Sequence, residues 1–189
     1  MLIAQQKRHE NIAEYLLYMW QVEDLLRVYN LDMHRIDDEI INRFDAQPEL
    51  RTEIHDWYEG LIMMMKAENK THTGHLQICK NVLIRLADLH AQLLNDDRFP
   101  EYRADFYRTL PYIVELRAKA GTQPAGELET CFNALYGVML LRMKGKEIST
   151  ETQNAIAQIA HFIGLLAQYF KRDEEQPLFA SDLQDNSNI

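Results

Sequence analysis

Residues 11–30, NIAEYLLYMWQVEDLLRVYN, constrain the fold more than any other stretch of this sequence. Their apolar side chains recur at helical spacing and cover most of the circumference, which is typical of a buried central helix rather than a surface helix. Glu23 interrupts the pattern, because at about 100° per residue it points into the apolar arc between Met19 and Leu26. Burying a carboxylate there is unfavourable unless it has a polar partner or a functional role, so Glu23 is the first candidate functional residue.

The rest of the 189-residue chain also consists of periodic apolar segments separated by polar turns, with only seven glycines and five prolines. This pattern predicts an all-α protein. We expect a single-domain bundle of six or seven mostly antiparallel helices with the first helix at its centre, because the connections are short. The helical domain is expected to span residues 1–171, and the acidic, aperiodic residues 172–189 are expected to form a flexible, disordered tail.

Helix ends are marked by capping residues, prolines and polar loops. The first helix is expected to run unbroken to Tyr29, and Pro111 is expected to kink or interrupt the helical region around it. Residues 68–74 (ENKTHTG) and 121–126 (GTQPAG) are expected to be loops. After the first helix, helices are predicted over residues 33–45 with a cap at Asp32, from Pro48 to the loop at residue 68, and from a cap at Thr73 to Leu94. Residues 99–108 and 111–120 are expected to form a kinked helix or two separate segments, with a cap at Thr109. The last two helices are predicted at residues 127–143 and from a capping box of Thr150 and Gln153 to Lys171.

Composition and charge exclude several classes of partner. The net charge of −9 is unfavourable for phosphate contacts, so we expect neither nucleic-acid binding nor attachment to an anionic membrane. The chain has no apolar run near the ~20 residues needed to span a bilayer and no signal peptide, so a cytoplasmic location is expected. Cys79 and Cys131 lie within apolar helical patterns and are expected to be buried thiols, since their spacing does not match a zinc site.

Several segments of the sequence carry a resemblance to a known family. They are IAEYLLYMWQVEDLLR, GHLQICKNVLIRLADLH, LPYIVELRAK, ETCFNALYG and KEISTETQNAI. From Met1 to about Lys171 the chain resembles an uncharacterised family of all-helical bacterial proteins, a domain of unknown function found chiefly in Bacteroidetes. The resemblance implies no reaction, ligand or catalytic residue, so candidate sites must come from the residues themselves.

The first candidate site is the pair Glu23 and Arg27. They are four residues apart, so they can pair on the surface of a helix. A partly buried ion pair, or a carboxylate bonded to a neighbouring Tyr or Trp, is the commoner arrangement for such residues. The functional interpretation makes Glu23 one wall of a polar pocket inside the bundle.

Glu68, His72 and His75 form the second candidate, a metal site. If the helices on either side of residues 68–74 were continuous, these three side chains would share one face with Cys79. Carboxylate and imidazole ligands suit zinc or iron. Two observations weaken this hypothesis: the loop contains poor helix formers, and no histidine in the chain follows a glutamate by three residues, as in di-iron bundles.

Three further basic residues are predicted to face inward. His90 lies within the apolar arc of its helix, where a lone histidine is more often a core residue than a catalyst. Arg103 and Arg117 lie close to the apolar arc around Pro111. They are expected to form internal salt bridges with Glu23 or Glu68, and the alternative is that they hold an anionic ligand.

No motif for catalysis or cofactor binding is present. The chain lacks a glycine-rich phosphate loop and the HExxH and GxSxG motifs, and its serines lie only in a cap and in the C-terminal tail. No cofactor is therefore predicted, with a divalent metal as the alternative.

Two functions remain open. The segment with Trp57, Tyr58 and Met63–Met65 has more apolar surface than one buried stripe needs. This favours a non-enzymatic interaction or scaffold protein that self-associates as a homodimer. The alternative is a small-molecule- or metal-binding bundle, or an enzyme, with an internal polar pocket lined by Glu23, Arg27, Glu68, His75, His90, Arg103 and Arg117.

Overall fold

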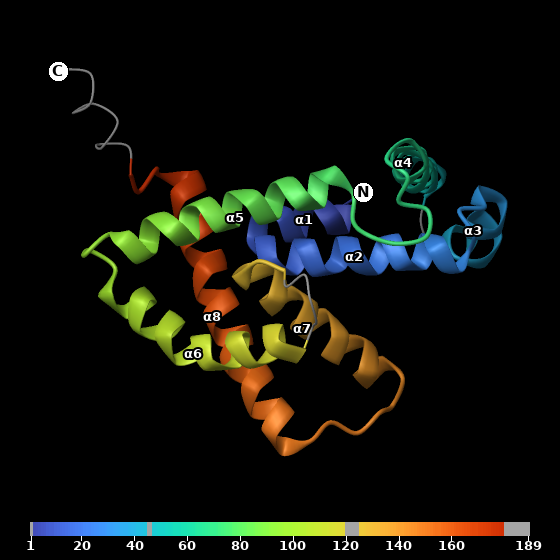
Figure 1. The fold of residues 1–189 in the computed structure, drawn as a ribbon. Coiled ribbons are helices and arrows are strands. Elements are labelled where there is room, and N and C mark those ends of the chain that lie inside the picture. Colours follow the sequence, from blue (N-terminus) through green and yellow to red (C-terminus); the bar gives the residue numbers. More distant parts are fainter. Residues whose placement is uncertain (1, 45–46, 120–124, 180–189) are drawn as a thin grey trace. The chain divides into compact units, whose positions relative to one another are not determined.

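The computed structural model describes residues 2–44, 47–119 and 125–179, and every regular element in these ranges is helical (Figure 1). The predicted all-α fold is confirmed. The described residues form α1 (Leu2–Glu10), α2 (Ile12–Val28), α3 (Met33–Glu39), the 3-10 helix η1 (Ile41–Arg43), α4 (Pro48–Ala67), α5 (Gln77–Asn95), α6 (Pro100–Lys119), α7 (Glu127–Met143) and α8 (Thr150–Glu175). No helix of the described part is long and apolar enough to cross a membrane.

The predicted first helix is divided into α1 and α2 at Asn11. The Asn11 side-chain oxygen accepts the backbone N–H of Ala13 at 3.0 Å, which caps the start of α2. Periodicity misses this break because the apolar pattern continues across it. The division also explains part of why the described residues contain eight α-helices rather than six or seven.

Two of the four predicted caps lie at the observed cap or one residue from it. Asp32 caps α3 as predicted, accepting the N–H groups of His34 and Arg35. The cap of α8 is Ser149 rather than Thr150, because the Ser149 hydroxyl accepts the Thr152 N–H at 3.2 Å. The error is one residue, and both positions carry a hydroxyl that can cap.

Helix α6 continues through Pro111, so the predicted cap at Thr109 is wrong. The Thr109 hydroxyl donates to the carbonyl of Asp105 at 2.9 Å, within the helix. Pro111 removes one backbone hydrogen bond, whose acceptor would be the carbonyl of Tyr107, and Tyr107 is 61% exposed. Packing of buried side chains on both sides of Pro111, such as Ile113, maintains the helix at that cost.

The contacts of the chain group into two units, and the first comprises residues 1–10 and 14–82. It contains α1, α3, η1, α4, nearly all of α2 and the first residues of α5. Helix α2 buries apolar side chains around most of its circumference, as its sequence predicts. Among them, Leu16 and Leu26 are completely buried, and Met65 of α4 is equally buried. These helices position the candidate site.

The second unit comprises residues 11–13 and 83–189. Its helices α6, α7 and α8 pack against one another. Ring contacts join His90, Tyr102, Phe106 and Phe162, with centroid distances of 4.9 Å to 5.8 Å. Helix α7 has the predicted bounds, and Gly145 follows it with a φ of +64°, a left-handed conformation that glycine adopts without steric cost.

The helical part of the chain extends beyond the predicted limit at residue 171. Helix α8 continues to Glu175. After it, the Leu178 N–H donates to Asp173 Oδ1 at 2.8 Å, and the Phe179 ring lies 5.6 Å from that of Phe99. The remainder of the predicted tail, residues 180–189, and residues 121–124 of the second predicted loop lie outside the described residues.

Candidate functional site

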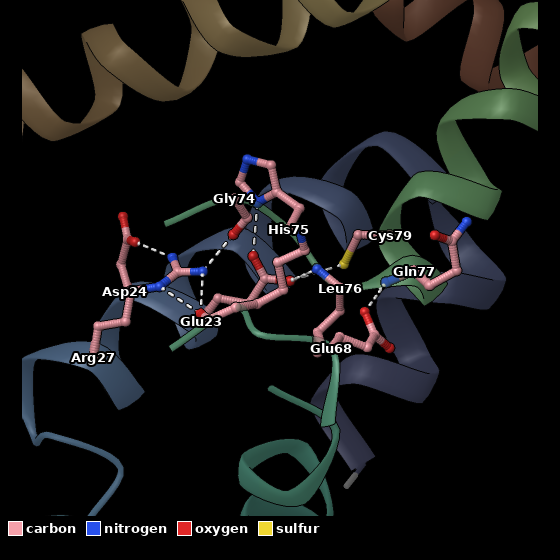
Figure 2. Close-up of polar contacts among 10 residues, drawn as sticks. Glu23, Asp24, Arg27, Glu68, Gly74, His75, Leu76, Gln77 and Cys79 are labelled. Carbon is pink, nitrogen blue, oxygen red and sulfur yellow. Dashed lines mark hydrogen bonds and ion pairs between the residues drawn. The ribbon is translucent and has the colours of Figure 1, made fainter. Parts of the chain in front are cut away.

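Glu23 of α2 is completely buried, and three donors surround its carboxylate. Oε2 lies 2.7 Å from His75 Nδ1, and Oε1 accepts the backbone N–H of Leu76 at 2.9 Å. The Cys79 thiol also donates to Oε1, at 3.4 Å (Figure 2). The charge that interrupts the apolar pattern of α2 therefore has several polar partners, all in the residues before and within the first turn of α5.

These contacts form the N-terminal cap of α5. The first N–H groups of a helix have no partner within it, and α5 follows a leucine, which cannot supply one. Glu23 accepts the N–H of Leu76, and Glu68 Oε2 accepts the N–H of Gln77 at 2.7 Å. The predicted cap at Thr73 is wrong because α5 begins at Gln77, four residues later. Two carboxylates also suit the positive end of the helix dipole.

His75 lies between Glu23 and the indole of Trp20. The two rings are stacked, with centroids 4.0 Å apart and an interplanar angle of 14°. With Glu23 ionised, Nδ1 would carry the proton of the His75–Glu23 contact, because a carboxylate only accepts hydrogen bonds. Nε2 points away from Glu23 (Figure 2), and the side chain is 28% exposed.

Arg27 binds the loop before α5 and not Glu23, so the predicted Glu23–Arg27 pair is wrong. Its guanidinium donates to Asp24 Oδ1 at 2.7 Å, to the carbonyl of Lys70 at 3.2 Å and 3.3 Å, and to the carbonyl of Gly74 (Figure 2). Periodicity places Arg27 correctly on the helix, but its partners depend on the path of the loop. Arg27 thereby holds residues 70–74 against α2.

The predicted metal site at Glu68, His72 and His75 is not assembled. Helices α4 and α5 are separate, and positive φ angles at Asn69 and Gly74 turn the chain between them. Glu68 and His75 are bonded to Gln77 and Glu23 respectively, and His72 is exposed. Within the described ranges these three side chains do not form a group of ligand atoms within 4.8 Å of one another.

A different group of ligand-type side chains lies on α4, and the sequence reasoning missed it. Ligand atoms of His55, Asp56 and Glu59 all lie within 4.8 Å of one another. His55 Nδ1 also lies 2.8 Å from Asp37 Oδ1, and this hydrogen bond raises the pKa of His55. The available signal was the spacing of His55 and Glu59, which places a histidine and a glutamate one helical turn apart.

His90 has its own partners in the second unit. Its Nδ1 lies 2.6 Å from the Tyr102 hydroxyl, and its Nε2 lies 3.7 Å from Glu127 Oε2, beyond hydrogen-bond distance. Burial lowers the pKa of His90, and the nearby Glu127 carboxylate opposes that shift. This is the arrangement of a histidine buried in a core rather than of a residue that reaches a ligand.

Asp105 is a buried carboxylate that the sequence reasoning did not identify. It is 1% exposed, and its Oδ1 accepts from Arg108 at 2.7 Å and from Gln158 at 3.2 Å. Its Oδ2 has no hydrogen-bond partner among the described residues. Its burial could have been predicted from its position between Tyr102 and Thr109 on the buried stripe of α6. The predicted break near Pro111 divides that stripe into two short segments and hides its periodicity.

The two candidate arginines are not part of one site. Arg103 donates from Nε to the carbonyl of Leu94 at 3.1 Å and pairs with Asp97 at 3.0 Å, so it caps the end of α5 instead of meeting Glu23 or Glu68. The Nε of Arg117 is buried without a hydrogen-bond partner in the described part of the chain.

The first unit also contains an apolar groove of about 360 Å³. Its walls come from α1, α2, α4 and one residue of α5. Gly60, at the middle of the α4 wall, leaves open space: a Cβ at this position would meet no atom within 4 Å. The lining residues are Ala4, Gln5, Arg8, Tyr15, Met19, Asp56, Trp57, Gly60, Leu61, Met64 and Ile78.

Comparison with known proteins identifies a family but no activity. No curated protein and no solved structure matched the chain. One family model matched, over residues 1–177, which is nearly the whole chain and includes every residue of the Glu23 network and of the groove. The chain therefore belongs to the family described as domain of unknown function DUF4924.

Proposed function

We propose that this protein is a non-enzymatic helical interaction protein that self-associates as a homodimer through the apolar groove lined by α1, α2 and α4. The observation that carries the proposal is the groove itself, whose lining is mostly apolar and includes the half-buried Trp57 and Met64. An apolar concavity of this kind on a helical surface fits a helix of a partner. Met63, beside the groove residues on α4, is 65% exposed and adds to the apolar surface.

Gly60 supports a close approach by another helix. A glycine inside a helix costs about 1 kcal/mol relative to alanine, so its presence in the middle of α4 has an energetic cost. The space beside Gly60 is open, which would allow a second helix to approach the backbone of α4. In a dimer with two-fold symmetry, the same residue of both copies would lie at or near the crossing point.

The charges of the groove favour a second copy of this chain as the occupant. Its lining contains one basic residue, Arg8, and one acidic residue, Asp56. A two-fold interface places the same surface on both sides, so Arg8 of each copy can face Asp56 of the other. Such pairs would offset part of the repulsion between two chains that each carry a net charge of −9.

A small apolar molecule is the alternative occupant of the same groove. A volume of about 360 Å³ lies at the lower end of the range for small-molecule pockets. The polar pocket expected from the sequence has less support, since Glu23 and His90 each have hydrogen-bond partners within their own units. The oligomeric state therefore separates the two occupants.

The test is to fill the groove by substitution at Gly60. Gly60→Leu places a side chain in the open space, and Gly164→Leu makes the same change in α8, where a Cβ also meets nothing within 4 Å. We expect a dimer for the wild type and for Gly164→Leu, and a monomer for Gly60→Leu, measured by size-exclusion chromatography with light scattering. Circular dichroism of each variant checks that it is folded.

A charge exchange tests the two-fold pairing independently. Arg8→Glu alone should weaken the dimer by at least tenfold in dissociation constant, which corresponds to about 1.4 kcal/mol, because it opposes Asp56 of the second copy with a like charge. Arg8→Glu combined with Asp56→Arg should restore most of the loss. A monomeric wild type, or a double variant weaker than the single one, would contradict the proposal.

A further inference from the structure

The structure brings three ligand-type side chains together on the outer face of α4. His55, Asp56 and Glu59 present one nitrogen and two carboxylate groups, and a ligand atom from each lies within 4.8 Å of the other two. His55 is half-buried, and the two acids are exposed. Zinc is bound by such nitrogen and oxygen ligands at ~2.0–2.2 Å, so the three donor atoms would have to converge on a shared ion.

A fourth residue, on a different helix, orients the imidazole. Asp37 Oδ1 of α3 lies 2.8 Å from His55 Nδ1, so with this hydrogen bond kept, Nε2 would be the nitrogen that binds an ion. Metal-ligating histidines almost always donate their second ring N–H to a carboxylate, a carbonyl or water, which fixes the ring and makes the ligating nitrogen more basic. Asp37 supplies this contact from outside the group of three.

His34 of α3 provides a comparison for the group on α4, because it also lies near a carboxylate but lacks a third ligand-type side chain. His34 Nδ1 lies 3.5 Å from Asp38 Oδ2, also one helical turn away, but the His34 side chain is 89% exposed. In the described ranges no third ligand atom joins that pair, and His55, Asp56 and Glu59 are the one group of three that does form. His34 and Asp38 therefore form a histidine–carboxylate pair without a third ligand, and His34 serves as the control histidine.

We propose that His55, Asp56 and Glu59 bind a divalent first-row transition-metal ion, with Asp37 as the positioning residue. An imidazole with two carboxylates suits zinc better than calcium or magnesium, which prefer oxygen ligands alone. Three protein ligands leave the remaining coordination positions to water. The proposal does not depend on self-association, although Asp56 also lines the groove.

The test is a calorimetric titration of the full chain, without a histidine tag, with zinc chloride at pH 7.5. We expect saturable binding of one ion per chain. His55→Gln and Glu59→Gln should each weaken binding by at least tenfold, and Asp37→Asn by about tenfold, the usual loss for an outer carboxylate. His34→Gln should leave the affinity unchanged, and circular dichroism checks that all four variants are folded.

Cobalt spectroscopy separates a positioning role of Asp37 from a purely structural one. Cobalt bound at the site should give visible absorption bands that shift in Asp37→Asn at a cobalt concentration that saturates this variant, and that are largely lost in His55→Gln at the concentration that just saturates the wild type. The absence of a saturable zinc site, an equal loss on His34→Gln, or equal affinity for magnesium and zinc would each overturn the proposal.

Discussion

The Glu23 carboxylate is a structural group that stabilises the start of a helix it does not belong to. Its residue is fully buried, and its two oxygens receive donors from His75, Leu76 and Cys79. Hydrogen bonds to a charged group contribute more to stability than neutral ones, about 1.5–3 kcal/mol each. The residue that most suggests a catalytic site in the sequence therefore has a sufficient structural role.

Glu23→Gln should lower the free energy of unfolding by about 1–3 kcal/mol. The amide oxygen of glutamine can still accept the Leu76 N–H, but its NH₂ group opposes a donor at His75 Nδ1. Urea denaturation measures the loss. Glu14→Gln on the same helix is the control, because Glu14 is exposed and pairs with Lys7 at the surface. Equal stability changes for the two variants would contradict the role of Glu23.

His90 should make the protein less stable in mildly acidic solution. Burial lowers its pKa in the folded state below the unfolded value of about 6.5, so the unfolded chain binds the proton first as the pH falls. The stability from neutral His90 is therefore complete above about pH 6.5 and is lost below it. Unfolding free energies at pH 7.5 and 5.5 should differ more for the wild type than for His90→Asn. Equal differences would show that His90 does not contribute.

The first turn of α5 is held by residues from outside the helix. Glu68 accepts the N–H of its first residue, Gln77, and Glu23 accepts that of the preceding Leu76. Arg27 binds carbonyls of the loop before the helix. Because these contacts come from other parts of the chain, this turn should open when one of them is removed, while the rest of the helix stays closed.

Thiol labelling tests this local opening. Burial raises the pKa of Cys79, with Glu23 adding to the shift, and burial also raises the pKa of Cys131 to about 12, so neither thiol should react in the folded wild type. In Arg27→Gln, Cys79 should become reactive several-fold faster than in the wild type, while Cys131 on α7 should not change. Mass spectrometry after timed labelling assigns each site. Parallel acceleration of both cysteines would indicate global destabilisation instead.

Local signals predict the elements well, and tertiary contacts account for the errors. Helix α7 has both predicted ends because the sequence just before it is rich in glycine and contains a proline, and Gly145 follows it. The predicted break at Pro111 is wrong because α6 is continuous there. The prediction rests on the local effect of proline on a helix and does not include the packing that holds α6 on both sides of Pro111.

In the candidate site, too, local signals predict what depends on one helix, and the errors concern contacts between distant parts of the chain. Periodicity correctly placed Glu23 inside, because burial depends on the face of one helix. It could not identify His75 and Leu76 as partners, because that contact depends on the conformation of residues 68–76. The group around His55 was missed for a related reason: Asp37, which orients the ring, is brought to it only by the packing of α3 against α4.

At the level of the whole molecule, the first unit contains a buried polar network that stabilises it and an apolar groove through which we propose it self-associates. The two features use different residues, with the network around Glu23 and the groove along α4. Substitutions in one should therefore leave the other intact. Glu23→Gln should lower stability without changing the oligomeric state, and Gly60→Leu should change the oligomeric state while the protein remains folded.

The most direct test of self-association is sedimentation equilibrium of the wild type and of Gly60→Leu over a dilution series. We expect a wild-type mass of two chains at high concentration that falls towards one chain on dilution, and a mass of one chain throughout for Gly60→Leu. A wild type with the mass of one chain at every concentration would contradict this expectation, as would a Gly60→Leu variant that dimerises as strongly as the wild type.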